Sequence, residues 1–133
     1  MPKVLNECFI VAIGTTLIYL SSSLAAQVNA AFSPPAQYLE QVGGYEVDCN
    51  ATPPSFAVTI SGADFWISGQ DLLLTGDAGL DPSTGLCISG VQTSFNGPAI
   101  LGDVFLRNVV AVFDVGAGEM RFAPHENYWY RSR

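Results

Sequence analysis

Few side chains in this sequence could carry out acid–base or nucleophilic chemistry. The twelve acidic residues lie singly along the chain, and His125 is the only histidine. A Ser–His–Asp triad would have to use His125, and no Gly-x-Ser-x-Gly turn is present. The cysteines form no Cys-x-x-Cys pair, so no zinc site or other metal site is indicated. Gly116-Ala117-Gly118 lacks the spacing of a dinucleotide-binding loop, and we expect no cofactor.

The aspartates are therefore the remaining candidates for catalysis. Asp103 directly follows the apolar run Ile100-Leu101-Gly102 and is predicted to be the N-cap of a short helix. Asp114 is assigned to a hairpin turn. The others are expected to lie in solvated loops, and they are Asp48, Asp64, Asp71, Asp77 and Asp81. None of these positions by itself indicates a pair of cooperating carboxyl groups.

The composition indicates one acidic globular domain. The chain has 133 residues, of which 49% are hydrophobic and 13% charged, which excludes a disordered or coiled-coil protein. Thirteen Gly and eight Pro among many β-branched residues predict short strands joined by tight turns. A net charge of −7 argues against nucleic-acid binding, which needs clustered Lys and Arg. It fits a secreted protein or one that works at low pH.

Two features could carry a covalent modification. Cys8, Cys49 and Cys87 allow one intramolecular disulfide. A Cys49–Cys87 bridge would contribute roughly 3–4 kcal/mol by closing a long loop; the alternative is that both residues are buried free thiols. Asn50-Ala51-Thr52 matches the acceptor pattern for N-glycosylation, although Pro53 lowers its expected use.

The segment Val11–Ser23, VAIGTTLIYLSSS, has two incompatible interpretations. Lys3 and the apolar run that follows resemble a secretory signal peptide, but Glu7 weakens the positive start. The run is also too short to span a bilayer, which needs about 20 residues. Alternatively, 9–12 is a buried strand, Gly14 a turn, and 21–23 the start of a helix with Leu24, Val28 and Ala31 or Phe32 on one face.

The elements beyond this segment are predicted to be mostly strands. They cover 45–49, 55–60, 65–67, 72–74, 86–91, 98–102, 109–113 and 119–123, with a polar loop at 76–85 and a short helix at 103–107. The last two strands are joined by the turn 114–118 and form a hairpin. The fold class is therefore mainly β with one or two short helices.

Four of these motifs, taken in order, resemble the carboxyl-terminal lobe of a pepsin-like aspartic endopeptidase of the fungal secreted kind. GTTLIYLSSSLAAQVNAAF resembles the residues after the second catalytic Asp-Thr-Gly. GGYEVDCN and TGLCISGVQ resemble the flanks of that lobe's disulfide, which implies a Cys49–Cys87 bridge. AILGDVFLRNVVAVFDVGAGEMRFAP resembles the end of the active-site loop and the closing hairpin. The resemblance covers 9–124, implies a lead-in at 1–8 and a tail at 125–133, and favours the folded interpretation of Val11–Ser23.

The resemblance also implies that catalytic groups are missing. Pepsin-like enzymes use two aspartates, one from each lobe, which share a proton because like charges about 3 Å apart cannot both ionise. Aligned on Gly14-Thr15-Thr16, the second aspartate is replaced by Ala12 and the following threonine by Ile13. No Asp-Thr-Gly or Asp-Ser-Gly occurs in the sequence. We therefore predict that the chain alone cleaves no peptides, and that Asp103 is structural.

The remaining expectations follow from the same resemblance. Gly14, Thr15 and Thr16 are predicted to bind substrate, although the Thr15 hydroxyl could instead bond within its loop. Ile100, Leu101 and Gly102 are predicted to support that loop. A peptide or protein substrate is expected only with an amino-terminal lobe present, and an exposed lobe interface would favour self-association. The alternative function is a non-catalytic peptide-binding protein. The family resemblance implies secretion. If residues 9–32 belong to the fold and no upstream signal exists, an intracellular protein is implied instead. Neither a membrane span nor a nucleic-acid partner is expected.

Overall fold

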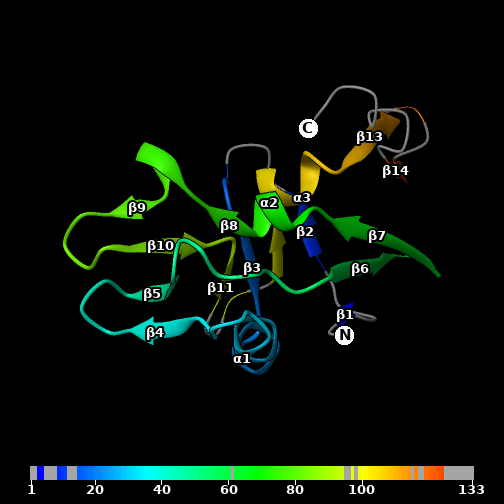
Figure 1. Ribbon diagram of the computed structural model, residues 1–133. Helices are drawn as coiled ribbons and strands as arrows, with labels where there is room; N and C mark the ends of the chain where they lie inside the picture. Colours follow the sequence, from blue (N-terminus) through cyan, green and yellow to red (C-terminus); the bar gives the residue numbers. More distant parts are fainter. Residues whose placement is uncertain are drawn as a thin grey trace.

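The computed structural model describes residues 3–4, 9–11, 15–60, 62–94, 97, 99–114, 116 and 119–124. Short strands dominate these residues, as the sequence predicts (Figure 1). The helices are α1 (Ser22–Ala30), α2 (Gly69–Leu72) and α3 (Asp103–Leu106), with a 3₁₀ turn η1 (Gly76–Ala78). The strands are β1 (Lys3–Val4), β2 (Phe9–Val11), β3 (Ile18–Leu20), β4 (Gln37–Leu39), β5 (Gly44–Val47), β6 (Phe56–Ile60), β7 (Ala63–Ile67), β8 (Leu73–Leu74), β9 (Leu80–Asp81), β10 (Leu86–Ser89), β11 (Val91–Thr93), β12 (Ala99–Leu101), β13 (Val109–Asp114) and β14 (Glu119–Pro124).

The central sheet has the strand order β11-β3-β12-β2. β12 lies between β2 and β3, pairing in parallel with β2 and antiparallel with β3. Thr15 and Thr16, which come shortly before β3, lie beside the end of β12, because their carbonyls accept the backbone N–H groups of Asp103 and Val104. Ile18 and Leu20 of β3 are fully buried while Tyr19 between them is half-buried, which is the alternation expected of a strand with one face on the core.

Two hairpin arms extend from this sheet on one side of the molecule (Figure 1). β4 and β5 form one arm, and β9 and β10 form the other. β5 also pairs with β10, so the arms belong to one sheet with β8. Cys49 and Cys87 form a disulfide with their Cα atoms 5.0 Å apart, which fixes the segment after β5 to β10 and confirms the bridge that the resemblance implied.

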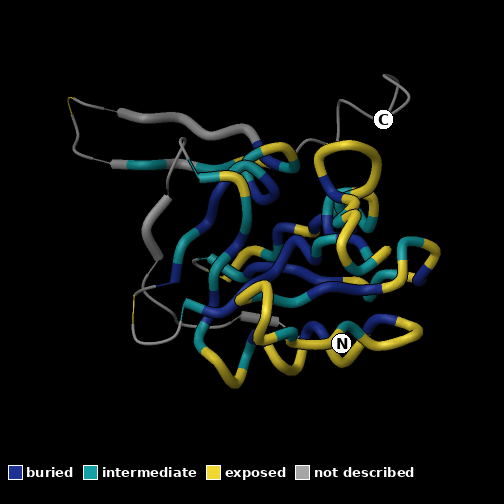
Figure 2. Tube along the Cα trace, turned by 90° about the vertical axis from the view of Figure 1, so that its left-hand side faces the viewer, coloured by how far each residue is buried: buried dark blue, intermediate teal, exposed yellow. Residues whose placement is uncertain are grey.

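The helix α1 packs against β3 and β11 and closes the core on one side (Figure 2). Val28 and Phe32 are buried, as predicted, but Leu24 is only partly buried and Ala31 is exposed. Asn29 is fully buried, and its side-chain nitrogen donates to the carbonyl oxygens of Ala25 and Val91. Residues 9–11 and 15–32 thus belong to the folded domain in this structure.

Two smaller sheets complete the fold. β6 pairs with β7 and with β1, so Lys3–Val4 joins a sheet although the sequence analysis assigned it to a lead-in. β13 and β14 form the predicted hairpin, with Asp114 opposite Glu119. The rings of Phe65, Phe105 and Phe122 meet edge to face, with centroids 5.7–6.5 Å apart, and join β7, α3 and β14. No helix within the described ranges is long and apolar enough to cross a membrane.

Candidate functional site

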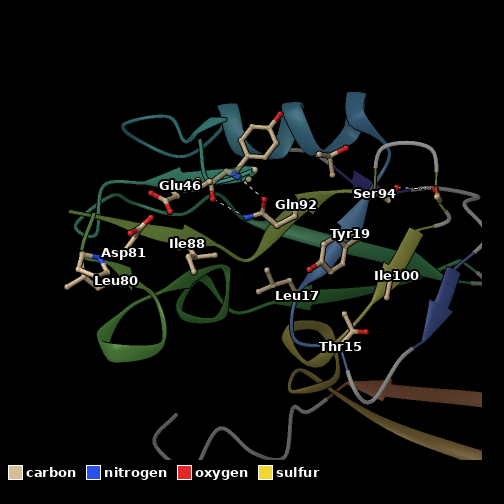
Figure 3. Close-up of a pocket in the computed structure, with 17 residues that line it drawn as sticks. Thr15, Leu17, Tyr19, Glu46, Leu80, Asp81, Ile88, Gln92, Ser94 and Ile100 are labelled. Carbon is tan, nitrogen blue, oxygen red and sulfur yellow. Dashed lines mark hydrogen bonds between the residues drawn. The ribbon is translucent and has the colours of Figure 1, made fainter. Parts of the chain in front are cut away.

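A hollow with a volume of about 950 Å³ lies between the central sheet and the two hairpin arms (Figure 3). One wall is the solvent-facing side of β3 and β12 with the loop before β3, and it presents Thr15, Leu17, Tyr19 and Ile100. The opposite wall is the β4–β5 turn and β5 itself, residues 42–46, with Leu80–Pro82 of the second arm alongside. We refer to this hollow as the cleft.

The loop that carries Thr15 and Thr16 is held by the start of α3. The backbone N–H of Asp103 donates to the Thr15 carbonyl at 2.7 Å, and that of Val104 donates to the Thr16 carbonyl at 2.9 Å. Gly102 makes this approach possible, because a Cβ there would lie 2.3 Å from the Thr15 oxygen and 2.5 Å from the Leu17 oxygen. The site loop and α3 therefore form one hydrogen-bonded unit.

These bonds correct the predicted role of Asp103. The N-cap of α3 is Gly102, Asp103 is the first helical residue, and no side chain caps this end. A cap is unnecessary because the carbonyls of Thr15 and Thr16 accept the N–H groups that a cap would otherwise satisfy.

Two carboxyl groups lie side by side at the outer end of the cleft (Figure 3). Glu46 is only 4% exposed and accepts a hydrogen bond from the Thr84 hydroxyl at 2.7 Å. Burial raises the pKa of Glu46 above its ordinary 4.5, and the nearby Asp81 carboxyl raises it further. The pKa of Asp81 is lowered, chiefly because the Ser83 hydroxyl donates to it. Of the two groups, Glu46 is therefore the one that binds a proton more readily.

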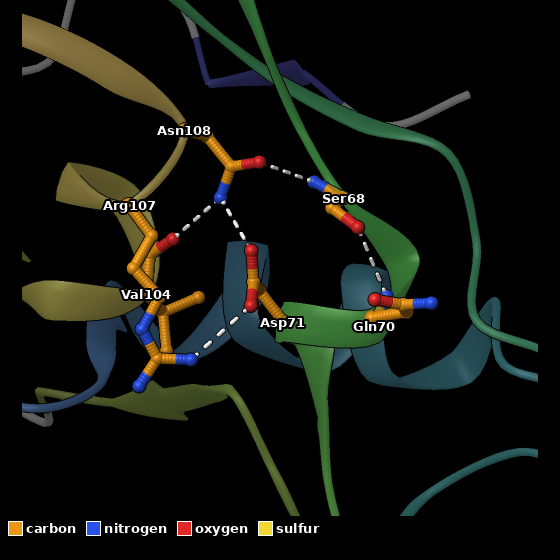
Figure 4. A network of polar contacts seen from close by, with 6 residues as sticks. All are labelled: Ser68, Gln70, Asp71, Val104, Arg107 and Asn108. Atoms are coloured by element: carbon orange, nitrogen blue, oxygen red, sulfur yellow. Dashed lines mark hydrogen bonds and ion pairs between the residues drawn. The ribbon is translucent and has the colours of Figure 1, made fainter. Parts of the chain in front are cut away.

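A polar network fixes the other end of α3 (Figure 4). The side-chain nitrogen of Asn108 donates to Asp71 at 2.9 Å and to the Val104 carbonyl at 2.9 Å. Its side-chain oxygen accepts from the Ser68 N–H at 2.9 Å. Asp71 also accepts from Arg107 at 3.1 Å. The sequence placed Asp71 and Asp81 in solvated loops, which is wrong for both, because each is partly buried and engaged with other side chains.

The structure brings together some of the predicted site residues. Thr15 and Ile100 line the cleft, whereas Thr16 is exposed beside it and Leu101 is buried in the core. Ala12, Ile13 and Gly14 lie outside the described residues, as do His125 and the tail. Asn50 is exposed in the turn after β5. In the described part of the chain, no group of three His, Cys, Asp or Glu side chains could hold a metal ion.

The wall formed by residues 42–46, and Gln92 at the base of the cleft, were not predicted. The one available signal was the pair Gly43-Gly44, since adjacent glycines in a short turn often mark a close approach of the backbone to another group. Gly43 has φ +73°, which serves the turn, and Gly44 lies directly against Gln92.

Comparison with known proteins gives consistent matches. The family model for eukaryotic aspartyl proteases matches residues 6–125. A probable aspartic-type endopeptidase of Aspergillus fumigatus is 50% identical over 119 residues, which is 86% of this chain and 27% of that protein. Penicillopepsin-1 of Penicillium janthinellum is 38% identical, covering 84% of this chain and 33% of its own. Aspergillopepsin-1 of Emericella nidulans is 36% identical, and the match covers 84% of this chain and 28% of that protein.

The chain thus spans about a quarter to a third of the length of these curated relatives. The mainly β architecture agrees with a single pepsin-like lobe, as the resemblance implied. Because the family model matches residues 6–125, which is most of the sequence, this chain belongs to the eukaryotic aspartyl protease family.

Proposed function

We propose that this chain is the carboxyl-terminal lobe of an aspartic-type endopeptidase and that its cleft binds an extended peptide. The observation that carries this proposal is the cleft itself. It is open along the central sheet, and each of the two arms opposite that sheet carries an exposed apolar side chain, Val42 at 40% and Leu80 at 47%. Exposed apolar groups at a rim favour contact with apolar peptide side chains.

The walls also suit the backbone of a peptide. Thr15 offers a hydroxyl on one side. Gly43 and Gly44 carry no side chain on the other side, so a peptide backbone can approach closely there. An extended peptide is recognised by hydrogen bonds along its backbone and by pockets for alternate side chains. Both kinds of group are present in the cleft.

The same proposal includes the absence of catalysis by this chain alone. By the family resemblance, Ala12 replaces the catalytic aspartate of this lobe and Ile13 the threonine that follows it. Neither side chain can accept or donate a proton, so this lobe supplies no member of the carboxyl pair that would activate water. Within this proposal Asp103 cannot replace the missing group, because it lies in the first turn of α3.

A second candidate function is non-catalytic binding of a peptide or a partner lobe. It is favoured by one observation: the loop at Thr15–Thr16 is held to the start of α3 by two backbone hydrogen bonds, with Gly102 packed against it. By the family resemblance, the aspartate position of the same loop is alanine. A binding protein needs that geometry but not the carboxyl group.

Two measurements on the purified chain test these proposals. Fluorescence anisotropy with a fluorescein-labelled, capped apolar hexapeptide should show saturable binding at pH 4 that an unlabelled peptidomimetic inhibitor of aspartic proteases displaces. A casein-hydrolysis assay at pH 3–5 should show no inhibitor-sensitive cleavage. Absence of binding would overturn the cleft as a peptide site. Inhibitor-sensitive cleavage would overturn the claim of inactivity.

We further propose that the protein passes through the secretory pathway. The Cys49–Cys87 disulfide supports this, because disulfides persist in oxidising compartments. The exposed Asn50 in an Asn-x-Thr pattern supports it as well. When the chain is directed through the secretory pathway of a yeast host, we expect a glycosidase-sensitive mass that Asn50→Gln abolishes. An unmodified product in that host would contradict the glycosylation.

A further inference from the structure

The side chain of Gln92 connects the two sheets that form the cleft. Gln92 lies on β11 and is 7% exposed. Its Oε1 accepts a hydrogen bond from the Tyr45 N–H at 2.7 Å, and its Nε2 donates to the Tyr45 carbonyl at 3.0 Å (Figure 3). Nε2 also donates to the Ser89 carbonyl at 2.9 Å. One amide group therefore satisfies three backbone groups on β5 and β10.

These bonds replace a backbone ladder. β11 pairs with β3, whereas β5 pairs with β4 and β10, and no ladder in the described part of the chain joins β11 to β5. The Gln92 amide presents one acceptor and one donor to Tyr45, as the backbone of a neighbouring strand residue would. Because the amide is buried, losing it would leave Tyr45 backbone groups without their partner.

Gly44 is matched to this arrangement. A Cβ at position 44 would lie 2.8 Å from Gln92 Oε1 and 3.5 Å from its Cδ. Any other residue would therefore push the amide away from Tyr45 or the β4–β5 arm away from the sheet. Glycine at 44 and glutamine at 92 together set how closely the two walls of the cleft approach.

We propose that Gln92 is a positioning residue of the cleft, whose amide holds residues 43–45 at a fixed spacing from the wall of Thr15, Tyr19 and Ile100. The inference rests on the proposed function, since the spacing matters to a ligand only if the cleft binds peptide. The role requires an amide. A carboxylate would face the Tyr45 and Ser89 carbonyls with two acceptors, while an apolar side chain would offer neither a donor nor an acceptor.

This difference between an amide and a carboxyl group gives a sharp test. In Gln92→Glu, the ionised side chain repels both carbonyls, but once protonated it offers one acceptor and one donor to Tyr45. Gln92→Met keeps the length and neutrality without the hydrogen bonds. Gln41→Glu is the matched control, because Gln41 is exposed on the same arm and does not line the cleft. Glu46, Asp81, Tyr19 and Tyr45 are the titratable groups around the cleft, so each variant is compared with the unsubstituted chain at the same pH.

Two readouts are measured at pH 3.5 and pH 7. The first is hydrogen–deuterium exchange in a peptide covering residues 42–46, and the second is anisotropy with the labelled apolar hexapeptide. We expect Gln92→Glu to exchange this segment roughly ten-fold faster at pH 7. At pH 3.5 its rate should lie much closer to that of the unsubstituted chain, because the protonated side chain restores both Tyr45 bonds and leaves only the Ser89 carbonyl without its donor. The affinity of Gln92→Glu for the hexapeptide should fall at pH 7, where exchange is faster, and recover at pH 3.5. Gln92→Met should show faster exchange at both pH values, and Gln41→Glu at neither.

The outcomes separate the two proposals. If both Gln92 variants exchange residues 42–46 at the rate of the unsubstituted chain at pH 7, the positioning role is overturned. If exchange responds as expected but the unsubstituted chain binds no hexapeptide, the proposed function fails while the structural role of Gln92 stands. If Gln92→Glu unfolds at pH 7, Gln92→Met decides, and unchanged exchange in that variant overturns the inference.

Discussion

Gly102 is the residue on which the geometry of the site loop depends most directly. Its backbone lies so close to the loop before β3 that a Cβ would come within 2.3–2.8 Å of Thr15 and Leu17 backbone atoms. The contact atoms belong to the backbone, so they cannot rotate away as a side chain could. The same approach lets the first two amides of α3 reach the carbonyls of Thr15 and Thr16.

Gly102→Ala is therefore expected to destabilise the protein and to displace the site loop. Overpacking of this kind costs roughly 2–3 kcal/mol in the free energy of unfolding. Urea denaturation measures that loss, and hexapeptide binding should weaken with it. Gly69→Ala is the control, since a Cβ there would meet only Pro53 at 3.4–3.5 Å, and it should change stability by less than about 0.5 kcal/mol. Equal stability of the two variants would contradict the role given to Gly102.

At the scale of elements, α3 connects the site to the rest of the fold. It begins at the carbonyls of the site loop, and just beyond its last residue Asn108 links it to Ser68 and Asp71 of the α2 segment (Figure 4). Phe105 within the helix is fully buried against Phe65 and Phe122. A helix this short has no stability of its own, so these contacts hold it in place.

Asn108 should contribute much more than Arg107 to the free energy of unfolding, because it holds the end of α3 in place. Asn108→Ala removes three hydrogen bonds in a partly buried network and should cost about 2–4 kcal/mol of unfolding free energy. Arg107→Gln removes an ion pair from a side chain that is 53% exposed and should cost less than about 1 kcal/mol. Urea denaturation of both variants measures the difference. A larger loss for Arg107→Gln would show that the ion pair, and not the amide, fixes the end of α3.

The carboxyl pair between β5 and β9 predicts how stability depends on pH. The folded protein raises the pKa of Glu46 above 4.5, so the folded state binds the Glu46 proton more tightly than the unfolded chain does. The stability contributed by this proton is fully present below pH 4.5 and is lost as the pH rises through the raised pKa. Asp81 behaves oppositely, because its lowered pKa stabilises the fold above about 3.8 and this is lost at lower pH. The unsubstituted chain should therefore melt at a lower temperature at pH 7 than at pH 4.5.

Glu46→Gln should remove most of that decrease, since the amide accepts the Thr84 hydrogen bond without a titrating proton. Differential scanning calorimetry between pH 3 and 7 measures both proteins. The control is Glu40→Gln, a carboxyl group near the surface of the β4–β5 turn. If the melting temperature of Glu46→Gln falls between pH 4.5 and pH 7 as much as that of the unsubstituted chain, a group other than Glu46 causes the decrease.

The elements were easier to predict from the sequence than the contacts between them. Alternation located β5 and β6, flanking Gly and Asp residues located β7, and a continuous apolar run located β13, because each signal lies within one short segment. Leu72 was predicted to begin a strand but ends α2, since the Ser68 side chain caps a helical turn before it. Glu46, Asp81 and Gln92 escaped prediction because their roles depend on partners 35–47 positions away, and no local pattern marks such pairs.

At the scale of the whole molecule, the chain matches a stretch that makes up about a quarter to a third of its curated relatives. The cleft lies on the open side of the central sheet, and the exposed rim residues Val42 and Leu80 are on its two arms. In such an arrangement, binding and catalysis can be lost separately. Under the proposed function, binding depends on the walls of the cleft, whereas catalysis would need two carboxyl groups that share a proton.

A chimera separates these two requirements. In the 50% identical Aspergillus fumigatus protein, the matched stretch is replaced by residues 6–125 of this chain, both as it stands and with Ala12→Asp and Ile13→Thr. The first chimera should bind the peptidomimetic inhibitor yet cleave casein roughly 10²–10⁴-fold more slowly than the parent at pH 3–5, because one proton-transfer group is missing. The second should regain most of that rate, since a carboxyl group again faces its partner across the cleft. If the chimera with Ala12 cleaves as fast as the parent, position 12 does not hold the catalytic group of this lobe.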